Sequence, residues 1–433
     1  MNYEECREWL EERRQSMGSV LGLDEVNKLL DLTERPDEKV KIIHIAGTNG
    51  KGSVGYLLEQ ILVRSRIRTG RFLSPAVVDE REIILVDGKM VYKTIWAEKL
   101  SYLIDLVEKN NLMATAFEIE LVLSLLIFCD KKCDTVIMEC GMGGRLDATN
   151  ACHNDLVDII TSISFDHRNF LGEKLEDISL HKFGIIKDAS SRVVIAPQKK
   201  DVIDYFKKFV KENTYVNLNN VVFSDYSIGK FEYFINNNKI FQQISYKNYV
   251  NLNLSLAGSF QQENAITVLD AVDVLNKTGY SIKMNAVVKA FENAFWPGRF
   301  ETIQKDRLFI LDGAHNPDAV DKLMNSVKMY FPRKKFVCII GMYKDKDYKK
   351  VINDYLKEAK AVVTVTARDR KRAVDAFELG KEIREVNENV TCADSYNESL
   401  EIATLLSDKS DIILVFGSLS FLGEMRELIN KAN

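Results

Sequence analysis

Short β-branched runs alternate with longer amphipathic segments along this chain, and that alternation restricts its possible folds more than any other feature. In the first half the predicted strands are Val40–Ala46, Arg71–Ser74, Thr135–Glu139, Ile159–Ser164 and Arg192–Ala196. The segments between them have the length and period of helices. Strands that alternate with helices form a parallel sheet covered by helices on both faces. The first half is therefore predicted to be an α/β domain with a mostly parallel sheet.

A second alternating series follows Trp296, Pro297 and Gly298, and a Pro-Gly pair is typical of a joint between domains. Its predicted strands are Leu308–Asp312, Phe336–Ile340, Ala361–Thr366, Val390–Ala393 and Ile412–Phe416. This layout predicts a Rossmann-like α/β domain over residues 296–433, after a first domain over residues 1–295. In open α/β sheets ligands bind beyond the carboxyl ends of strands, so we expect a site at loop ends facing a cleft between the domains.

Residues from Val221 to Leu256 alternate differently and resemble antiparallel strands. The sequence YFINNNKIF predicts a hairpin that turns at Asn236–Asn238. We therefore expect a small antiparallel patch that decorates the first domain.

The composition is that of a soluble globular protein and narrows the possible functions. Of the 433 residues, 46% are hydrophobic and 28% are charged, with a formal net charge of −4. These values exclude a disordered polyelectrolyte and a basic nucleic-acid coat. The seven cysteines form no CxxC pair, the start is charged, and the most apolar stretch, Ile119–Cys129, contains Glu120. We expect reduced thiols, a cytoplasmic location, and no membrane or nucleic-acid partner.

A glycine-rich loop lies between the first predicted strand and an amphipathic helix in IIHIAGTNGKGSVGYLLEQIL. Glycines let backbone N–H groups surround a phosphate, the helix N-terminus is positive, and Lys51 adds a mobile charge. Gly50, Lys51, Gly52 and Ser53 are therefore predicted to bind a nucleoside triphosphate, which makes this a P-loop-type domain. The loop departs from GxxxxGK[ST], because Ile45 stands at the first glycine and Gly52 separates Lys51 from Ser53. A glycine-rich turn without a ligand is the alternative.

Two further strand ends carry groups that bind hard cations. Glu139 ends a predicted strand in VIMECGMGGRLDATN, where a carboxylate can hold Mg²⁺ beside a nucleotide. His167 directly follows another predicted strand and can direct a ring nitrogen into the cleft. Lys182 lies in a helical stretch, where its ammonium would repel cations unless CO₂ converted it to an anionic carbamate. A solvated Glu139 and a plain surface Lys182 are the alternatives.

Three shorter signals follow. Asn264 lies at the start of an amphipathic helix, where its amide can bind a base or phosphate or simply cap the helix. Arg299 in WPGR places a planar guanidinium at the predicted joint, which suits a phosphate or carboxylate. Asp312 and His315 in LDGAHNP combine an acid and an imidazole at a buried strand exit, which favours a functional site over an ordinary turn.

In this order the segments are similar to the folylpolyglutamate synthase and dihydrofolate synthase family, a branch of the Mur-type ATP-dependent ligases. The resemblance runs from about Tyr3 to the C-terminus. Its motifs are GTNGKGS, ECGMGGRLDATN, DH followed by LG, KFGIIK, WPGR, LDGAHNP, GMYKDKD and FGSLSFLGE.

The resemblance also implies roles for individual residues. ATP would be bound by Gly50, Lys51, Gly52, Ser53, Asn264, Arg299 and Asp312. Magnesium, as a pair of ions, would be bound by Ser74, Glu139, His167 and Lys182, with Lys182 matching the family's carbamylated lysine. The pterin substrate would contact Thr115, Phe117, Glu118, Leu146, Asp147 and Ala148. The catalytic residues would be Lys51, Lys182 and His315.

The implied reaction joins L-glutamate to a carboxylate of a folate or of dihydropteroate and releases ADP and phosphate. ATP phosphorylates the carboxylate, and the glutamate amine then attacks the acyl phosphate. Such a reaction needs charge neutralisation and placement rather than a protein nucleophile. One alternative is a Mur-type ligase acting on a cell-wall precursor, and another is a nucleotide switch that ligates nothing. A monomer is expected.

Overall fold

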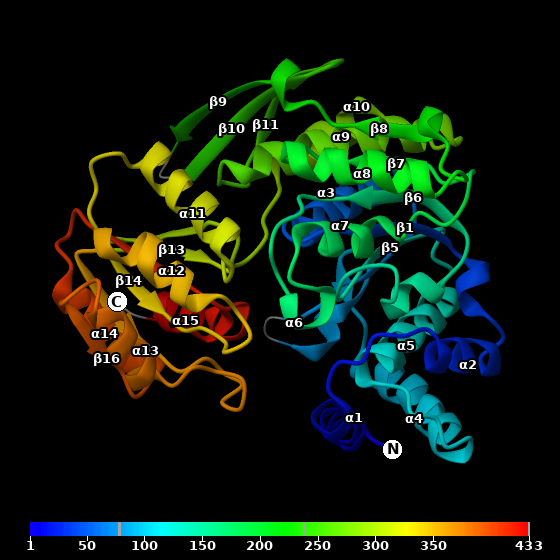
Figure 1. Cartoon of the computed structure of the whole chain (residues 1–433), viewed down its shortest axis with the longest axis horizontal. Coiled ribbons are helices and arrows are strands. Elements are labelled where there is room, and N and C mark those ends of the chain that lie inside the picture. Colours follow the sequence, from blue (N-terminus) through cyan, green and yellow to red (C-terminus); the bar gives the residue numbers. More distant parts are fainter. Residues whose placement is uncertain (77–78, 237–238, 432–433) are drawn as a thin grey trace. The chain divides into compact units, whose positions relative to one another are not determined.

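The computed structural model describes residues 1–76, 79–236 and 239–431, which form two compact units (Figure 1). Unit 1 contains residues 1–163, 171–228 and 264–290. Unit 2 contains residues 164–170, 229–263 and 291–433. Each unit has its own sheet with helices, so the predicted α/β fold class is confirmed. No helix in the described part of the chain is long and apolar enough to cross a bilayer.

The sheet of unit 1 has eight strands in the order β4-β3-β2-β5-β1-β6-β7-β8, and only the pairs made by β3 are antiparallel. The strands are β1 (Lys41–Ala46), β2 (Thr69–Phe72), β3 (Ile84–Val86), β4 (Lys89–Met90), β5 (Thr135–Glu139), β6 (Asp155–Ile160), β7 (Val193–Ile195) and β8 (Val221–Phe223). Its helices are α1 (Tyr3–Met17), α2 (Asp24–Leu32), α3 (Lys51–Arg64), α4 (Lys93–Lys109), α5 (Ala116–Asp130), α7 (Leu175–Phe183) and α8 (Lys200–Glu212). Three helices include residues of both units: α6 (Arg168–Leu171), α9 (Phe260–Lys277) and α10 (Met284–Glu292).

Buried side chains on β5 alternate between two layers of helices. Val136 and Met138 join the core made with α1, α2, α4 and α5. Ile137 points the other way, because a Cβ added to Gly55 of α3 would lie 3.5 Å from its Cγ2 atom. Helix α5, which contains the most apolar stretch of the chain, Ile119–Cys129, is a buried core helix. This two-sided burial explains why the central strands read as nearly continuous apolar runs.

Strand β6 differs most from its prediction. It covers Asp155–Ile160 instead of Ile159–Ser164, so it begins four residues earlier and ends four residues earlier. Aspartate is depleted in strands, which hid the true start. The prediction that Asp166 and His167 directly follow this strand is therefore wrong, since β6 ends at Ile160.

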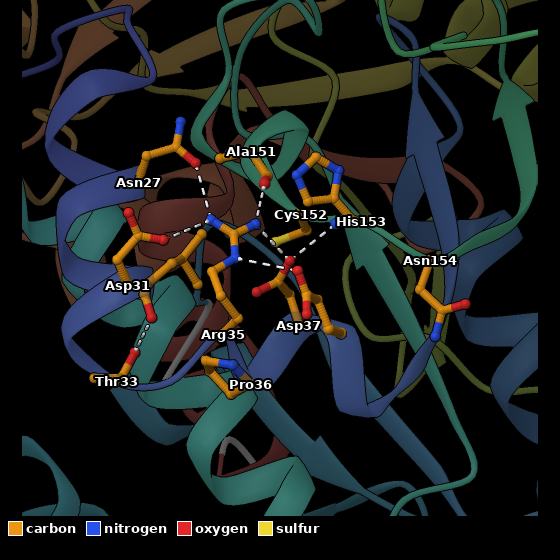
Figure 2. A network of polar contacts seen from close by, with 12 residues as sticks. Asn27, Asp31, Thr33, Arg35, Pro36, Asp37, Ala151, Cys152, His153 and Asn154 are labelled. Atoms are coloured by element: carbon orange, nitrogen blue, oxygen red, sulfur yellow. Dashed lines mark hydrogen bonds and ion pairs between the residues drawn. The ribbon is translucent and has the colours of Figure 1, made fainter.

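A polar network in unit 1 joins the segment before β1 to the loop before β6 (Figure 2). Arg35 donates hydrogen bonds to Asn27 Oδ1 at 3.0 Å, Asp37 Oδ2 at 2.8 Å and Ala151 O at 2.9 Å. The fully buried Asp37 also accepts a bond from the His153 amide at 3.0 Å. Charge-assisted bonds of this kind are about twice as strong as neutral ones. The network therefore positions the residues that lead into β6.

A small antiparallel sheet in unit 2 has the order β11-β10-β9. Its strands are β9 (Lys230–Asn236), β10 (Lys239–Tyr246) and β11 (Tyr249–Leu254). The predicted hairpin is thus present, although residues 237–238 of its predicted turn lie outside the described residues. The sequence attached this patch to the first domain, whereas the structure groups it with unit 2. The reason is packing, since Ile240 joins the core around α11 and the Tyr233 ring lies 5.0 Å from that of Tyr330.

The larger sheet of unit 2 has six strands in the order β12-β13-β17-β14-β15-β16. They are β12 (Glu301–Gln304), β13 (Leu308–Asp312), β14 (Phe336–Ile340), β15 (Ala361–Thr364), β16 (Val390–Cys392) and β17 (Ile412–Phe416). The helices are α11 (Pro317–Tyr330), α12 (Tyr348–Tyr355), α13 (Ala376–Arg384), α14 (Tyr396–Leu406) and α15 (Leu419–Lys431). Only β12 is antiparallel, and it was not predicted.

Alternate residues of β13 belong to two separate cores. Leu308 and Ile310 pack with α11, α12 and α13, whereas Phe309 and Leu311 pack with α14 and α15. Asp312 ends the strand at its carboxyl end, where open α/β sheets bind ligands.

Candidate active site

The glycine-rich loop of unit 1 connects the end of β1 to the start of α3 at Lys51. Gly47 and Gly50 adopt φ angles of +148° and +96°. A Cβ on Gly47 would lie 1.8 Å from Thr161 Oγ1, and one on Gly50 would lie 2.4 Å from Asn264 Oδ1. Both positions therefore require glycine for space as well as for backbone conformation. The contact also brings Asn264, a predicted ATP-binding residue, to the loop.

Two lysines meet at one carbonyl of this loop. Lys51 Nζ donates to Gly47 O at 3.0 Å, and Lys182 Nζ donates to the same oxygen at 2.9 Å. Lys182 is only 3% exposed, so the alternative of a plain surface lysine is wrong. Two ammonium groups and the N-terminus of α3 concentrate positive charge at the loop. This arrangement can bind a polyanion such as a triphosphate.

Glu139 lies at the end of β5 and is paired with Ile45 in the neighbouring strand, two residues before the loop. Its Oε1 accepts a bond from Arg71 Nη2 at 2.9 Å, and Arg71 also donates to Gly52 O at 3.0 Å. Glu139 is buried, so the alternative of a solvated Glu139 is wrong. Arg71 was not predicted as a site residue, because it begins a predicted strand, where a charge has no obvious use.

Arg71 also approaches Glu59 of α3, with Nη1 3.5 Å from Oε2. Both side chains are at most 1% exposed. Burial raises the pKa of Glu59, and the Arg71 charge opposes that rise. The guanidinium therefore links α3, β2 and β5 directly below the loop.

The residues around Glu139 fit a hard cation only in part. A carboxylate is the right donor for Mg²⁺, and Oε2 is the oxygen of Glu139 that these Arg71 bonds do not use. Ser74 follows β2, which runs parallel to β5 with Phe72 paired to Met138, so Ser74 and Glu139 leave the sheet at the same edge. His167 is described within unit 2, where its amide donates to Asp166 Oδ1 at 2.8 Å.

Thr115 and Glu118 form a capping box at the start of α5. The Glu118 Oε2 atom accepts from the Thr115 amide at 2.6 Å and from its hydroxyl at 2.8 Å. Both residues are buried, so these bonds hold the helix start in place. Phe117 is partly exposed, and its ring lies 5.5 Å from that of Phe72 and against Gly141. Of these three predicted substrate contacts, only Phe117 has a side chain that takes no part in the capping box and is partly exposed.

Asp147 has a local role of the same kind. Its Oδ2 accepts from the Met142 amide at 2.7 Å, and its Oδ1 accepts from the Thr149 hydroxyl at 2.6 Å. Burial raises the pKa of Asp147, and these bonds oppose the rise. Leu146 and Ala148 flank it, and the Leu146 carbonyl accepts from the Gly22 amide at 3.0 Å. Asp147 therefore shapes the loop after β5.

In unit 2, Asp312 is held by two backbone amides. Phe300 N donates to its Oδ2 at 2.7 Å, and Ala314 N donates to its Oδ1 at 2.8 Å. Burial raises the pKa of Asp312, and the Arg299 charge opposes the rise. A Cβ on Gly313 would lie 3.2 Å from Arg299 Nη1. The structure thus brings Arg299 and Asp312 close together, and their contact with a nucleotide stays a prediction.

His315 belongs to a second cluster of unit 2, centred on Asp166. Its Nδ1 donates to Gly313 O at 2.8 Å, because a carbonyl can only accept, and its Nε2 lies 3.5 Å from Asp166 Oδ2. Lys346 Nζ donates to Asp166 Oδ1 at 2.7 Å, and Asn316 Nδ2 donates to Oδ2 at 3.2 Å. Burial would raise the pKa of Asp166, but His315 and Lys346 hold it well below its usual range. Lys346 lies in the motif GMYKDKD, which was the only signal that pointed to it.

Comparison with known proteins agrees with this geometry. The model of the Mur ligase middle domain matches residues 45–272, which are 228 of the 433 residues. The chain belongs to the Mur ligase family. A second model, the Mur ligase glutamate ligase domain, matches residues 298–419.

The relatives narrow the branch of the family. Dihydrofolate synthase/folylpolyglutamate synthase of Bacillus subtilis is 29% identical, covering 98% of this chain and 98% of its own. The Escherichia coli protein of the same name is 29% identical over 90% of this chain and 86% of its own. A crystal structure of Mycobacterium tuberculosis folylpolyglutamate synthase complexed with ADP and AMPPCP superposes with a TM-score of 0.85 at 26% identity, covering 100% of both chains. The predicted family resemblance and the predicted class of ATP-dependent ligase are confirmed.

Proposed function

We propose that this protein joins L-glutamate to a carboxylate of a folate, of dihydropteroate, or of both, at the expense of ATP. The observation that carries the proposal is the loop at residues 47–53, where two lysines and the start of α3 surround a glycine backbone. The named relatives are folate and dihydrofolate ligases, which favours this substrate class over a cell-wall precursor. A switch that ligates nothing is disfavoured for the same reason.

The loop of unit 1 would bind the ATP phosphates through Gly50, Gly52 and Ser53. Lys51 now donates to Gly47 O and Thr48 O, so its ammonium has only to turn from these neutral carbonyls to a phosphate oxygen. Charge-assisted bonds to phosphate are stronger than bonds to carbonyls, which favours that turn. Asn264 lies against the loop and would contact the nucleotide there. In unit 2, Arg299 and Asp312 would contact the nucleotide.

Ser74, Glu139 and His167 would hold magnesium, which neutralises phosphate charge when bound. Arg71 would orient Glu139 by holding Oε1. Lys182 would carry a carbamate, formed when its unprotonated amine attacks the carbon of CO₂ and a proton leaves to solvent. The nitrogen of the carbamate keeps one hydrogen, so the bond to Gly47 O can survive the modification.

Phe117, Leu146 and Ala148 would contact the pterin ring, and the partly exposed face of Phe117 suits a flat aromatic ligand. Thr115, Glu118 and Asp147 would support this surface through the bonds they make locally. His315 would orient the glutamate or accept the proton of its ammonium group. Its Nδ1 is held by Gly313 O, and its Nε2 lies 3.5 Å from Asp166 Oδ2, so the Asp166 carboxylate would stabilise the imidazolium that forms when Nε2 takes up that proton.

The test is an assay with two acceptors side by side. Purified protein with ATP, magnesium and L-glutamate should release phosphate only when dihydropteroate or tetrahydrofolate is added. Mass spectrometry should find the acceptor with one additional glutamyl residue. Phosphate release without any acceptor would favour a nucleotide switch, and release with a cell-wall precursor alone would favour the other ligase.

Two variants test the site assignments. Lys51→Ala should abolish turnover, and normal turnover would refute the loop assignment. Lys182→Ala should lose activity and regain part of it when a short carboxylate such as acetate replaces the missing carbamate. An unmodified amine in intact-mass and crystallographic analysis of active protein would contradict the carbamate.

A cytoplasmic location, a monomeric state and the lack of nucleic-acid or membrane partners stay predictions. So does the division into domains 1–295 and 296–433. Sedimentation analysis and cell fractionation would test the first two.

A further inference from the structure

A buried polar cluster lies between two strands of unit 1. His44 belongs to β1, and Asp155 and Asp158 belong to the neighbouring strand β6. One ligand atom from each of the three lies within 4.8 Å of the others. His44 and Asp158 are 0% exposed, and the side chain of Asp155 is 10% exposed.

An irregularity in strand pairing brings both carboxylates to one face. Residues three apart on a regular strand point to opposite faces. Here Asp155 pairs with Ile42 and Asp158 pairs with His44, with a register shift between Ile42 and Ile43. Because Ile42 and His44 share a face of β1, both carboxylates lie beside that face. Strand irregularities often re-aim side chains in this way near sites.

The side-chain contacts of His44 distinguish its two ring nitrogens. Its Nε2 lies 2.9 Å from Thr149 Oγ1 and 3.2 Å from Cys140 Sγ, and the Thr149 hydroxyl donates to Asp147 Oδ1 at 2.6 Å. Nδ1, by contrast, has no hydrogen-bond partner among the described residues. Nδ1 is therefore the nitrogen open to a cation, as in a metal-binding histidine whose other nitrogen is held by the protein.

Each of the three residues has at least one acceptor atom without a donor in the described part of the chain. Among the described residues, His44 Nδ1, Asp155 Oδ1 and both carboxylate oxygens of Asp158 have no hydrogen-bond partner. The Ser191 hydroxyl approaches Asp158 without reaching hydrogen-bond geometry. Lys187 Nζ donates to the other oxygen of Asp155 at 2.5 Å, so one positive charge faces two carboxylates. Unpaired buried acceptors are costly, which calls for a cation or for protons between them.

We propose that His44, Asp155 and Asp158 bind a divalent transition-metal ion, with Zn²⁺ as the ion that fits best. One imidazole nitrogen and carboxylate oxygens are ordinary zinc ligands, whereas Mg²⁺ and Ca²⁺ prefer oxygen alone. Asp158 can supply both of its oxygens, which completes four donor atoms. Thr149 hydrogen-bonds to Nε2 of His44, and Lys187 hydrogen-bonds to Oδ2 of Asp155. These bonds orient two of the three ligands, as in other metal sites. The ion would join β1 to β6 and has no part in the proposed ligase chemistry.

The test starts from the intact wild-type chain expressed with added zinc. After gel filtration in a weak chelator, elemental analysis should find about one zinc per chain. Protein that is unfolded in strong chelator and refolded without metal should unfold at a lower temperature, and refolding with Zn²⁺ should restore it. Refolding with Co²⁺ should give the visible absorption bands of a low-coordinate cobalt site. These measurements on the wild type do not depend on any variant folding.

Asp158→Asn separates this site from other zinc-binding groups of the chain. The variant should lose at least tenfold in zinc content and lose the cobalt bands, while Asp201→Asn on the exposed face of α8 should keep both. If a shared proton fills the cluster instead, the wild type will hold no more zinc than Asp158→Asn. Asp158→Asn, which removes a buried carboxylate, will then be at least as stable as the wild type. Either result overturns the proposal.

Discussion

At the residue scale, the loop that precedes α3 depends on two glycines whose roles are steric. Gly50 combines φ of +96° with Asn264 Oδ1 only 2.4 Å from the position of an added Cβ. The backbone N–H groups of the loop can surround a phosphate only while this path is kept. The position therefore couples the loop path to the start of α9.

Gly50→Ala should lower ATP affinity by about tenfold or more, because left-handed strain and the clash with Asn264 together exceed ~1.4 kcal/mol. Gly279→Ala is a matched control, since Gly279 has φ of +100° but nothing within 4 Å of an added Cβ. Gly279→Ala should lose a small amount of stability, because alanine is strained at this φ angle. It should keep its ATP affinity, measured by calorimetry. Equal affinities for the two variants would show that the loop does not bind ATP.

Arg71 is the second residue on which the site depends, because it faces two buried carboxylates. Arg71→Met should lower the free energy of unfolding by ~3 kcal/mol near neutral pH, since Glu59 and Glu139 are then buried without a counter-charge. The pKa of Glu59 is already raised by burial, and loss of Arg71 raises it further. A carboxyl with a raised pKa contributes stability at low pH that is lost as pH rises through the folded pKa. The deficit should therefore grow between pH 5 and pH 8.

Urea unfolding of the wild type and Arg71→Met across this range would measure the effect. The triple variant with Glu59→Gln and Glu139→Gln serves as the control, because it has no carboxylate left to pair. The triple variant should recover the stability that Arg71→Met loses. Its difference in stability from the wild type should not grow between pH 5 and pH 8. A deficit that is constant with pH would contradict the assignment of Arg71 as a counter-charge.

At the element scale, α5 begins at a capping box whose residues were predicted as substrate contacts. Glu118 accepts two bonds from Thr115, so the pair satisfies groups that the helix start leaves open. Helix α1 has the same motif at Asn2 and Glu5, on an exposed part of the chain. The two boxes allow a structural role to be separated from a binding role.

Thr115→Ala should cost about 1 kcal/mol of stability or more, and Asn2→Ala should cost less because its bonds are exposed. If Thr115 acts only through the helix start, the KM for the pterin substrate should change little once each variant is assayed below its unfolding temperature. Steady-state kinetics and thermal unfolding would be measured on the same preparations. A large rise in KM with unchanged stability would mean direct substrate contact.

At the scale of the whole molecule, unit 2 is discontinuous in sequence. The sheet β9–β11 precedes α9, yet Ile240 is buried in the same core as α11 and β13. Its cross-strand partner Ile235 is 49% exposed. One member of this pair therefore contributes to the core of unit 2, whereas the other lies largely in solvent.

Ile240→Ala should lower the free energy of unfolding of the chain by about 2–4 kcal/mol, through lost burial and a cavity. Ile235→Ala should change it by less than about 0.5 kcal/mol. Denaturant unfolding monitored by circular dichroism would compare the two. Equal, small effects would indicate that β9–β11 is not part of the core of unit 2 in solution.

The sequence alone determined the features that local pattern carries. Runs such as Thr135–Glu139 and Leu308–Asp312 match β5 and β13 end for end, because a strand buried on both faces is a nearly continuous apolar run. The loop at residues 47–53 was predicted for a similar reason, since its glycines are required by a local backbone path. Family motifs then indicated the ligase class.

Only the tertiary structure decided the partners of charged residues that lie within strands or far apart in the chain. Arg71 and Glu139 meet because β2 and β5 are neighbours, although 68 positions separate them. Asp155 and Asp158 lie in β6, whereas the sequence predicted this strand to begin only at Ile159. A register shift directs both carboxylates toward His44. Burial of a charge depends on what the rest of the chain packs around it, and no local pattern records that.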